Sequence, residues 1–236
     1  MNPENAKNKK PRKIWKMILF LGLILILGFI LACVFYIIQL IRTGEWQNGQ
    51  PMSNLQNSDK KADENVLKEM TKDSYWLGSA NPKVTIIEFA DFSCSMCENS
   101  FSNVREIGIK YKDDVKMIFK DFPVVSDNSS SLALAARCAG EQGLFWPMYD
   151  KLFINQGITE EAKLIELAKQ TGADTARFTT CFDSKKYATQ INKDYEDGNL
   201  LKISGTPTWF INGIKVEGDI PHDTFIEIIE SLLNNN

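Results

Sequence analysis

The chain has 236 residues, enough for one large or two small domains, and its 27 basic residues nearly balance its 30 acidic residues. This balance gives no strong electrostatic field, so we expect no nucleic acid partner and a surface of mixed, solvated charges. Residues 1–72 differ in composition from the rest of the chain, which favours a single globular domain preceded by a segment of another kind.

The N-terminal segment contains a long apolar stretch. No residue from Met17 to Ile38 is charged, and a helix of that length is about 33 Å long, enough to cross a bilayer. Six basic residues precede the stretch, whereas Arg42 is the only basic residue after it until Lys60. We therefore predict a cytoplasmic basic N-terminus at 1–13 and a single transmembrane helix at 14–41 that anchors an extracytoplasmic domain in the cell membrane.

A cleaved signal peptide is the alternative, but the apolar stretch is longer than usual for one and no small-residue cleavage site closes it. Cys33 is expected to be an inert thiol buried in the membrane, because Leu31 fits a lipoprotein processing site poorly. Residues 42–72 are polar with little aliphatic clustering, which predicts a flexible linker in which residues 62–70 could form a short helix.

Residues 73–236 carry the patterns of a mixed α/β domain. Residues 84–89 form a short β-branched and aromatic run, which predicts a strand buried on both faces. A helical pattern begins at Cys94 or just after it, and residues 115–119 resemble a second strand. The order strand, helix, strand implies a parallel pair with a right-handed crossover.

From about 129 to 199 the pattern is helical, which predicts a helical subdomain inserted into the α/β domain. The expected helices are Leu132 to Cys138, Phe145 to Phe153, Glu160 to Gln170, Asp174 to Phe182 and Tyr187 to Tyr195. A strand at 208–211, a two-residue turn at Asn212-Gly213 and a strand at 214–216 then predict a hairpin. Pro221 opens a final helix.

Cys94 and Cys97 lie at the junction between the first predicted strand and the helix that follows it. Their spacing allows a small disulfide ring across one helical turn. The amides and macrodipole at a helix N-terminus stabilise a thiolate at Cys94, lowering its pKa from about 8.5 into a range of about 3.5–7.5. Cys97 should be shielded, so it can resolve a mixed disulfide without competing as the first attacker. The pair therefore predicts thiol–disulfide exchange.

A metal site and an inert disulfide are the other uses of this pair. A structural zinc ion would need two further ligands. The predicted extracytoplasmic residues offer only Cys138, Cys181 and His222, and these do not form a second closely spaced pair of ligands. Copper(I) is a better alternative, because two thiolates beside Met96 are soft ligands. An inert bridge usually closes a longer loop. We predict neither a resident metal nor a diffusible cofactor.

Two motifs on opposite sides of the helical insertion resemble the DsbA-like branch of the thioredoxin superfamily. They are Ile87-Glu88-Phe89-Ala90-Asp91-Phe92-Ser93-Cys94-Ser95-Met96-Cys97 and Gly205-Thr206-Pro207-Thr208-Trp209-Phe210-Ile211-Asn212-Gly213. The resemblance covers the chain from about Asp73 to its end. It implies a thioredoxin fold with an inserted helical subdomain, which agrees with the order of the predicted elements.

The resemblance implies roles for four further residues. Pro207 would follow a cis peptide bond beside the cysteines, and Thr206 would offer backbone groups to an extended substrate. Without the resemblance, an ordinary trans peptide bond in a turn is expected before Pro207. In either case we expect Pro207 at the edge of the sheet, because it has no N–H and begins a strand. Glu88 and Lys120 would pair beneath the cysteines and assist proton transfer at Cys97, since a buried carboxylate needs a partner or a proton. The alternative is a Glu88 at a strand edge that reaches solvent.

Cys138 and Cys181 lie in different predicted helices of the insertion, and an oxidising compartment favours a bridge between them. Some DsbA-like proteins resemble this chain in having such a structural disulfide. Two buried free thiols are the alternative.

The sequence thus predicts an extracytoplasmic thiol–disulfide oxidoreductase. Its partners would be exported proteins with cysteine thiols and a membrane redox partner that recycles the cysteine pair. Ser95 and Met96 replace the Pro-His pair of the strongly oxidising type, so a reductase or isomerase remains an alternative to a net oxidase. A copper(I) carrier using Cys94, Met96 and Cys97 is the alternative outside this enzyme class.

Overall fold

The computed structural model describes residues 22, 25–33, 35 and 61–235. The chain divides into two units, Met1–Gln50 and Pro51–Asn236. In the first unit the described residues are helical and their side chains are largely exposed. Most of the predicted transmembrane helix at 14–41 lies outside the described residues, as do the predicted cytoplasmic residues 1–13. Among the residues that are described, no helix is both long enough and apolar enough to cross a membrane.

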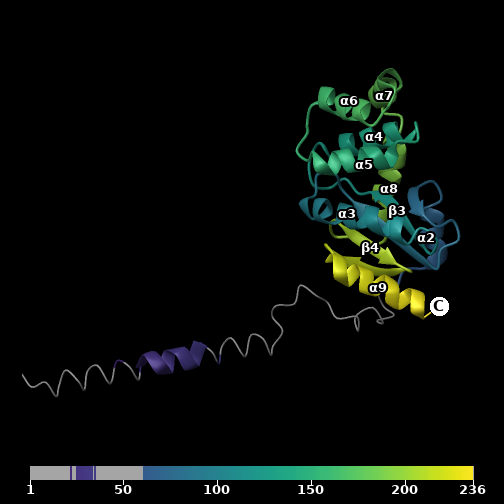
Figure 1. The fold of residues 1–236 in the computed structure, drawn as a ribbon. Helices are drawn as coiled ribbons and strands as arrows, with labels where there is room; N and C mark the ends of the chain where they lie inside the picture. Colours follow the sequence, from purple (N-terminus) through teal and green to yellow (C-terminus); the bar gives the residue numbers. More distant parts are fainter. Residues whose placement is uncertain (1–21, 23–24, 34, 36–60, 236) are drawn as a thin grey trace, which may run out of the picture. The chain divides into compact units, whose positions relative to one another are not determined.

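The second unit is built on a mixed sheet with the strand order β1-β3-β2-β4-β5 (Figure 1). The strands are β1 (Tyr75–Gly78), β2 (Val84–Ala90), β3 (Val115–Asp121), β4 (Thr208–Ile211) and β5 (Ile214–Glu217). The β2–β3 pair is parallel, as the sequence predicts, and the other pairs are antiparallel. The central strands and the C-terminal hairpin match the predicted strands, whereas β1 is an edge strand that the sequence analysis did not predict.

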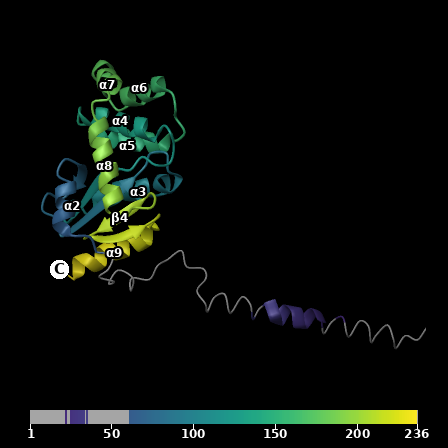
Figure 2. The same ribbon diagram turned by 180° about the vertical axis from the view of Figure 1, so that it is seen from behind.

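Helices pack on this sheet and extend from it. They are α2 (Glu64–Met70), α3 (Ser95–Lys110), α4 (Ser129–Gly140), α5 (Phe145–Ile154), α6 (Glu161–Gln170), α7 (Thr175–Asp183), α8 (Ala188–Leu200) and α9 (His222–Asn234). Helices α4 to α7 gather at one end of the sheet, and α8 runs from this group back to the sheet (Figure 2). The helical insertion predicted at about 129–199 therefore corresponds to α4 to α8, which lie between β3 and β4.

The two faces of the sheet carry separate cores, because side chains alternate along β2. Ile86 belongs to the larger core, which includes α3, α5 and α9, whereas Ile87 and Phe89 belong to a smaller core on the other face. Leu67 of α2 is buried in the smaller core, and Lys61 forms a bridge with β5. The predicted linker at 42–72 is therefore packed on the domain from Lys61 onwards.

Candidate active site

Cys94 lies at the N-terminus of α3, just after β2. It is the N-cap residue of the helix, with φ −85° and ψ 120°, and its sulfur accepts a hydrogen bond from the amide of Cys97 at 3.4 Å. Both thiols are free in this structure, and they differ in exposure, with Cys94 6% exposed and Cys97 0%. The outer thiol is thus the one that a reactant can approach.

The two thiols have opposite acidities. The pKa of Cys94 falls from 9.0 to about 6, chiefly through a hydrogen bond with the side chain of Cys97. Burial opposes this change, while the Thr206 side chain and the backbone amides of Met96 and Cys97 reinforce it. Burial raises the pKa of Cys97 far above its ordinary value, helped by its hydrogen bond to Cys94 and by the charge of Glu88. At neutral pH Cys94 is therefore the thiolate and Cys97 the thiol.

Thr206 and Pro207 lie opposite the cysteine pair, and the peptide bond between them is cis. The carbonyl oxygen of Thr206 lies 3.2 Å from the Cys94 sulfur and accepts a hydrogen bond from it when Cys94 is protonated. The carbonyl of Pro207 accepts from the amide of Gly218 at 2.8 Å. The prediction of a sheet edge at Pro207 is wrong, because β4 runs between β2 and β5; the proline is tolerated there because it precedes the first residue of the strand.

Glu88 is buried in the middle of β2, the central strand, and is 1% exposed. Its carboxylate accepts a hydrogen bond from the hydroxyl of Tyr149 at 3.3 Å. Burial raises the pKa of Glu88 from 4.5 to about 8; the Tyr149 hydrogen bond opposes this and the charge of Cys94 adds to it. Glu88 is thus a carboxylic acid at neutral pH, and the alternative of a solvent-exposed glutamate at a strand edge is wrong.

Lys120 does not pair with Glu88, and this prediction is wrong. In the parallel register Glu88 lies beside Phe119, whereas Lys120 lies beside Phe89. Since neighbouring residues in a strand point to opposite faces, Glu88 and Lys120 lie on opposite faces of the sheet. The fully buried Lys120 ammonium instead contacts Asp194 at 2.5 Å and Asp197 at 2.8 Å.

These contacts belong to a buried ionic cluster that joins β3 to the helical insertion. The cluster consists of Lys120, Asp121, Arg137, Asp194 and Asp197. Arg137 of α4 bridges Asp121 at the end of β3 and Asp194 of α8. Burial raises the pKa of Asp121 from 3.8 to about 6 against the opposing charge of Arg137. The cluster fixes the insertion to the sheet and takes no part in the cysteine site.

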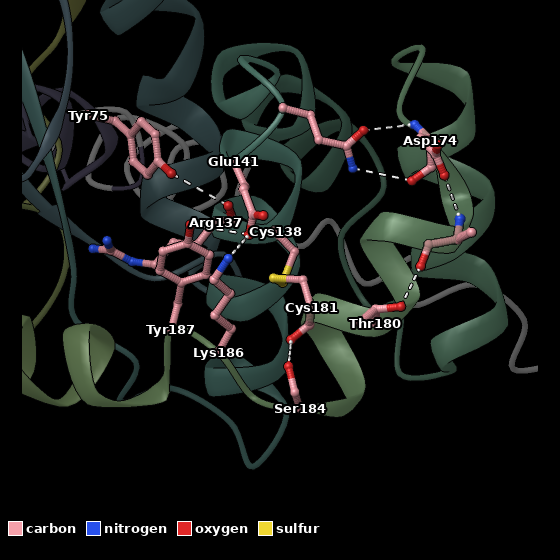
Figure 3. The surroundings of a disulfide bond; sticks show 12 residues. Tyr75, Arg137, Cys138, Glu141, Asp174, Thr180, Cys181, Ser184, Lys186 and Tyr187 are labelled. Atoms are coloured by element: carbon pink, nitrogen blue, oxygen red, sulfur yellow. Dashed lines mark hydrogen bonds and ion pairs between the residues drawn. A yellow bond between two sulfur atoms is a disulfide. The ribbon is translucent and has the colours of Figure 1, made fainter.

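Cys138 and Cys181 form a disulfide between α4 and α7 (Figure 3). Their Cα atoms are 5.7 Å apart and both side chains are buried. The carbonyl oxygen of Cys181 accepts a hydrogen bond from the hydroxyl of Ser184. The bond therefore lies within the helical insertion, far along the chain from the Cys94–Cys97 pair.

Two residues that sequence reasoning did not select also contact the cysteine turn. Asp91, between β2 and Cys94, accepts backbone hydrogen bonds from Ser93, Val124 and Val125. Gln156, in the loop after α5, donates to the carbonyl oxygen of Cys94 at 2.9 Å. Asp91 stands within the cysteine motif, and its position just after an apolar strand was the one available signal; nothing in the sequence marks Gln156.

A cavity of about 400 Å³ lies between α4 and α8. Its lining includes Ser130, Ser131, Lys185 and Tyr195 and no cysteine. The candidate chemistry is at the cysteine pair and not in this cavity. Within residues 61–235 and the short described helix, no three His, Cys, Asp or Glu side chains are arranged to hold a metal ion.

A mixed sheet, a cysteine pair at the start of its crossover helix and a facing cis-proline together define a thioredoxin-like domain. The thioredoxin family model matches residues 70–231. The chain belongs to this thioredoxin family.

The chain also matches segments of much longer curated proteins. It is 34% identical over 143 residues to the Na(+)/H(+) antiporter NhaA 3 of Salinispora tropica, covering 60% of this chain and 22% of the antiporter. It is 26% identical over 154 residues to the NhaA antiporter of Herminiimonas arsenicoxydans, covering 65% of this chain and 25% of that protein. The chain thus spans about a quarter or less of the length of these relatives.

Solved structures with the same fold include one that is named a thiol-disulfide exchange protein. Oxidised BdbD from Bacillus subtilis is 27% identical, with a TM-score of 0.59, over 68% of this chain and 93% of BdbD. The thiol-disulfide exchange protein α-DsbA2 from Wolbachia pipientis is 20% identical, with a TM-score of 0.65, over 71% of this chain and 92% of that chain. At this lower identity the second likeness shows the fold alone.

Proposed function

We propose that this protein is an extracytoplasmic thiol–disulfide oxidoreductase that introduces disulfides into exported proteins through Cys94 and Cys97. The observation that carries the proposal is the difference between the two thiols. Cys94 has its pKa lowered to about 6 at a helix N-terminus, and the buried Cys97 has its pKa raised. The family membership and the likeness to thiol–disulfide exchange proteins support it.

In the proposed reaction a substrate thiolate attacks the Cys94 sulfur of the Cys94–Cys97 disulfide. The bond to Cys97 breaks, Cys97 leaves as a thiolate, and a mixed disulfide forms between Cys94 and the substrate. A second substrate thiolate then attacks the substrate sulfur of that bond and releases Cys94 as a thiolate. The substrate loses two electrons and the cysteine pair gains them, so no diffusible cofactor is needed.

Glu88 is proposed to supply the proton that the leaving Cys97 requires. With a pKa raised to about 8, Glu88 holds a proton at neutral pH. Its carboxylate, once ionised, lies close enough to raise the pKa of Cys97. A carboxylate formed by this transfer would lie in a buried site, which favours its return to the acid form. Lys120 has no part in this step, because it lies on the opposite face of the sheet.

Thr206 and Pro207 are proposed to position the substrate backbone beside Cys94. The carbonyl oxygen of Thr206 is 3.2 Å from the Cys94 sulfur and can accept a hydrogen bond from a substrate amide, whereas Pro207 has no amide hydrogen to donate. A substrate strand that reaches Cys94 therefore has a backbone acceptor next to the reacting sulfur.

We also propose that the domain is tethered to the cell membrane by a helix at 14–41, with the N-terminus in the cytoplasm. The support is the uncharged stretch from Met17 to Ile38 and the basic residues before it. Two relatives are named as ion antiporters, so a related domain joined to a membrane protein has precedent. The recycling partner would then be a membrane protein that reoxidises Cys94 and Cys97.

A trapping experiment tests the assignment of the two cysteines. Cys97→Ala should form mixed disulfides with substrate proteins and fail to release them, because no neighbouring thiol remains to attack the bond. These complexes should appear on non-reducing gels and disappear with dithiothreitol, whereas Cys94→Ala should trap little. Equal trapping by the two variants would refute the assigned roles.

A reductase or isomerase of the same fold is the second candidate, favoured by the replacement of Pro-His by Ser95 and Met96. The reduction potential separates the candidates: about −120 mV is typical of an oxidase such as DsbA, and about −270 mV of thioredoxin. Copper(I) binding without any thiol exchange would instead support a metal carrier.

A further inference from the structure

The two carboxyl oxygens of Glu88 differ in their hydrogen bonding. The hydroxyl of Tyr149, on α5 of the helical insertion, donates to Oε2 of Glu88 at 3.3 Å. The other oxygen, Oε1, is buried and has no hydrogen-bond partner among the residues that the structure describes. The insertion therefore contacts one oxygen of the buried acid and leaves the other free to act.

Aromatic packing holds Tyr149 in place. The side chain is completely buried, and the ring centroids of Phe92, Phe119 and Phe153 lie 5.9, 5.5 and 4.8 Å from its own, each in an edge-to-face arrangement. Phe119 is also the residue of β3 that lies beside Glu88 in the sheet. A ring enclosed in this way has little freedom to turn, so the Tyr149 hydroxyl reaches Glu88 from a fixed direction.

Glu88, Tyr149 and Cys97 form one buried group of titratable side chains. Burial raises the pKa of Tyr149 well above its ordinary value, and the charges of Glu88 and Cys97 add to the rise. The Tyr149 hydroxyl is therefore a donor at neutral pH and keeps its own proton. Its hydrogen bond opposes the effect of burial on the pKa of Glu88, and Cys94 is the charged group that adds to that effect. Since the charge of Glu88 also acts on Cys97, the acid and the inner thiol are close enough to interact.

We propose that Tyr149 is a positioning residue that keeps the acid proton of Glu88 on Oε1 and so directs it to the sulfur of Cys97. A protonated carboxyl group has one O–H and one carbonyl oxygen. Because Tyr149 donates to Oε2, Oε2 is the carbonyl oxygen and the proton lies on Oε1. This inference rests on the proposed oxidoreductase function, and it gives the helical insertion a part in the chemistry.

The proton transfer accompanies the attack of a substrate thiolate on the Cys94 sulfur. The Cys94–Cys97 bond breaks with its electron pair on the Cys97 sulfur, which takes the proton from Oε1 of Glu88 and becomes a thiol. The carboxylate left behind keeps the hydrogen bond from Tyr149, and such a bond is about twice as strong to a charged acceptor as to a neutral one. Tyr149 therefore stabilises Glu88 most after the proton has left. Glu88 later regains a proton from solvent.

An infrared titration of the oxidised full-length protein tests the hydrogen bond, because the disulfide removes Cys94 and Cys97 from the titration. The carbonyl band of protonated Glu88 is isolated by subtracting the spectrum of the matching Glu88→Gln protein. In Tyr149→Phe this band should move to higher frequency, because the carbonyl oxygen loses its donor. Glu88 should also bind its proton about tenfold more tightly, so the band should persist to higher pH than in wild type.

The rate at which dithiothreitol reduces the oxidised protein tests the proton transfer, because Cys97 leaves in this reaction. Tyr149→Phe should slow it by about threefold to tenfold, since a weaker acid donates its proton more slowly. In a Glu88→Gln background the same change should alter the rate by less than about twofold, because the proton donor is already absent. A purely structural effect of the lost hydroxyl would slow both backgrounds equally.

Tyr111→Phe is the matched control, because the Tyr111 hydroxyl donates to the exposed Glu230 at 3.0 Å. It should leave the carbonyl band, the titration and the rate as in wild type. Fluorotyrosine at position 149 keeps the ring and the hydroxyl, so it tests the inference even if Tyr149→Phe folds poorly. Its hydroxyl is a stronger donor, and it should lower the carbonyl frequency and weaken proton binding by Glu88.

A carbonyl band that keeps the wild-type frequency or moves lower in Tyr149→Phe would overturn the inference. An unchanged rate with dithiothreitol, or an equal loss of rate in both backgrounds, would overturn it as well. A wild-type protein that oxidises no thiol would instead overturn the proposed function itself, whereas the infrared titration needs no substrate. The two failures are thus distinguishable.

Discussion

Replacement of Glu88 by glutamine should change how the stability of the oxidised protein depends on pH. Burial raises the pKa of Glu88 from 4.5 to about 8, so between these values the folded state binds a proton that the unfolded state has lost. The free energy of unfolding therefore decreases as the pH rises through this window. At about 1.4 kcal/mol per pKa unit the whole effect is roughly 5 kcal/mol, of which about 3.5 kcal/mol falls between pH 5 and pH 8.

The measurement is denaturant unfolding of the oxidised protein at pH 5, 6, 7 and 8, because the disulfide removes Cys94 and Cys97 from the titration. Relative to wild type, Glu88→Gln should gain up to about 3.5 kcal/mol in unfolding free energy from pH 5 to pH 8. The gain is smaller than this limit because the disulfide also removes the Cys94 charge, which adds to the effect of burial on the Glu88 pKa. Asp121 and other groups titrate in both proteins and cancel. Glu227→Gln, at an exposed position of α9, is the control and should keep the wild-type slope. Parallel profiles for wild type and Glu88→Gln would refute the reasoning.

Three further predictions concern other parts of the domain. In reduced protein the thiolate absorbance of Cys94 should appear with a midpoint near pH 6, and Cys97→Ala should raise that midpoint because it removes the largest cause of the lowered pKa. Lys120→Met should lower the free energy of unfolding by about 3–5 kcal/mol, because it removes the buried ammonium that contacts both Asp194 and Asp197. The matched change at the half-exposed Lys193 should cost less than about 1 kcal/mol, and equal losses would contradict the role of the buried cluster. Cys181→Ala opens a disulfide that spans 43 residues and should cost about 4 kcal/mol by the chain-entropy model; an unchanged denaturation midpoint would argue against the bond.

The order of strands and helices in the domain could be predicted because their patterns are local. β2 and β3 are short apolar runs, the hairpin has an Asn-Gly turn, and the helices of the insertion have regular apolar spacing. β1 was not predicted because three of its four residues are partly buried and Trp76 is exposed, so no alternation or apolar run marks the strand. Its place in the sheet depends on pairing with β3, which is not a local property.

The relation between Glu88 and Lys120 could not be predicted for a different reason. Both lie in strands that were located correctly, but the register of two parallel strands decides which side chains share a face. The charged partners of Lys120 come from α8, and Asp197 is 77 residues away in the chain. The sequence indicated that Glu88 and Lys120 would be buried charges needing partners, and only the three-dimensional arrangement identifies which partners they have.

The complete burial of Cys97 has a consequence for reagents as well as for substrates. Cys97 is 0% exposed and Cys94 is 6% exposed, so only Cys94 of this pair can react with an electrophile while the domain is folded. Among the cysteines of residues 61–235, an inhibitor or label should therefore modify Cys94 alone, and modification of Cys97 would report that the domain has opened; Cys33, which is also free and is exposed, is counted separately. The fraction of Cys97 that becomes labelled therefore measures local unfolding at the start of α3, and the measurement needs no substrate.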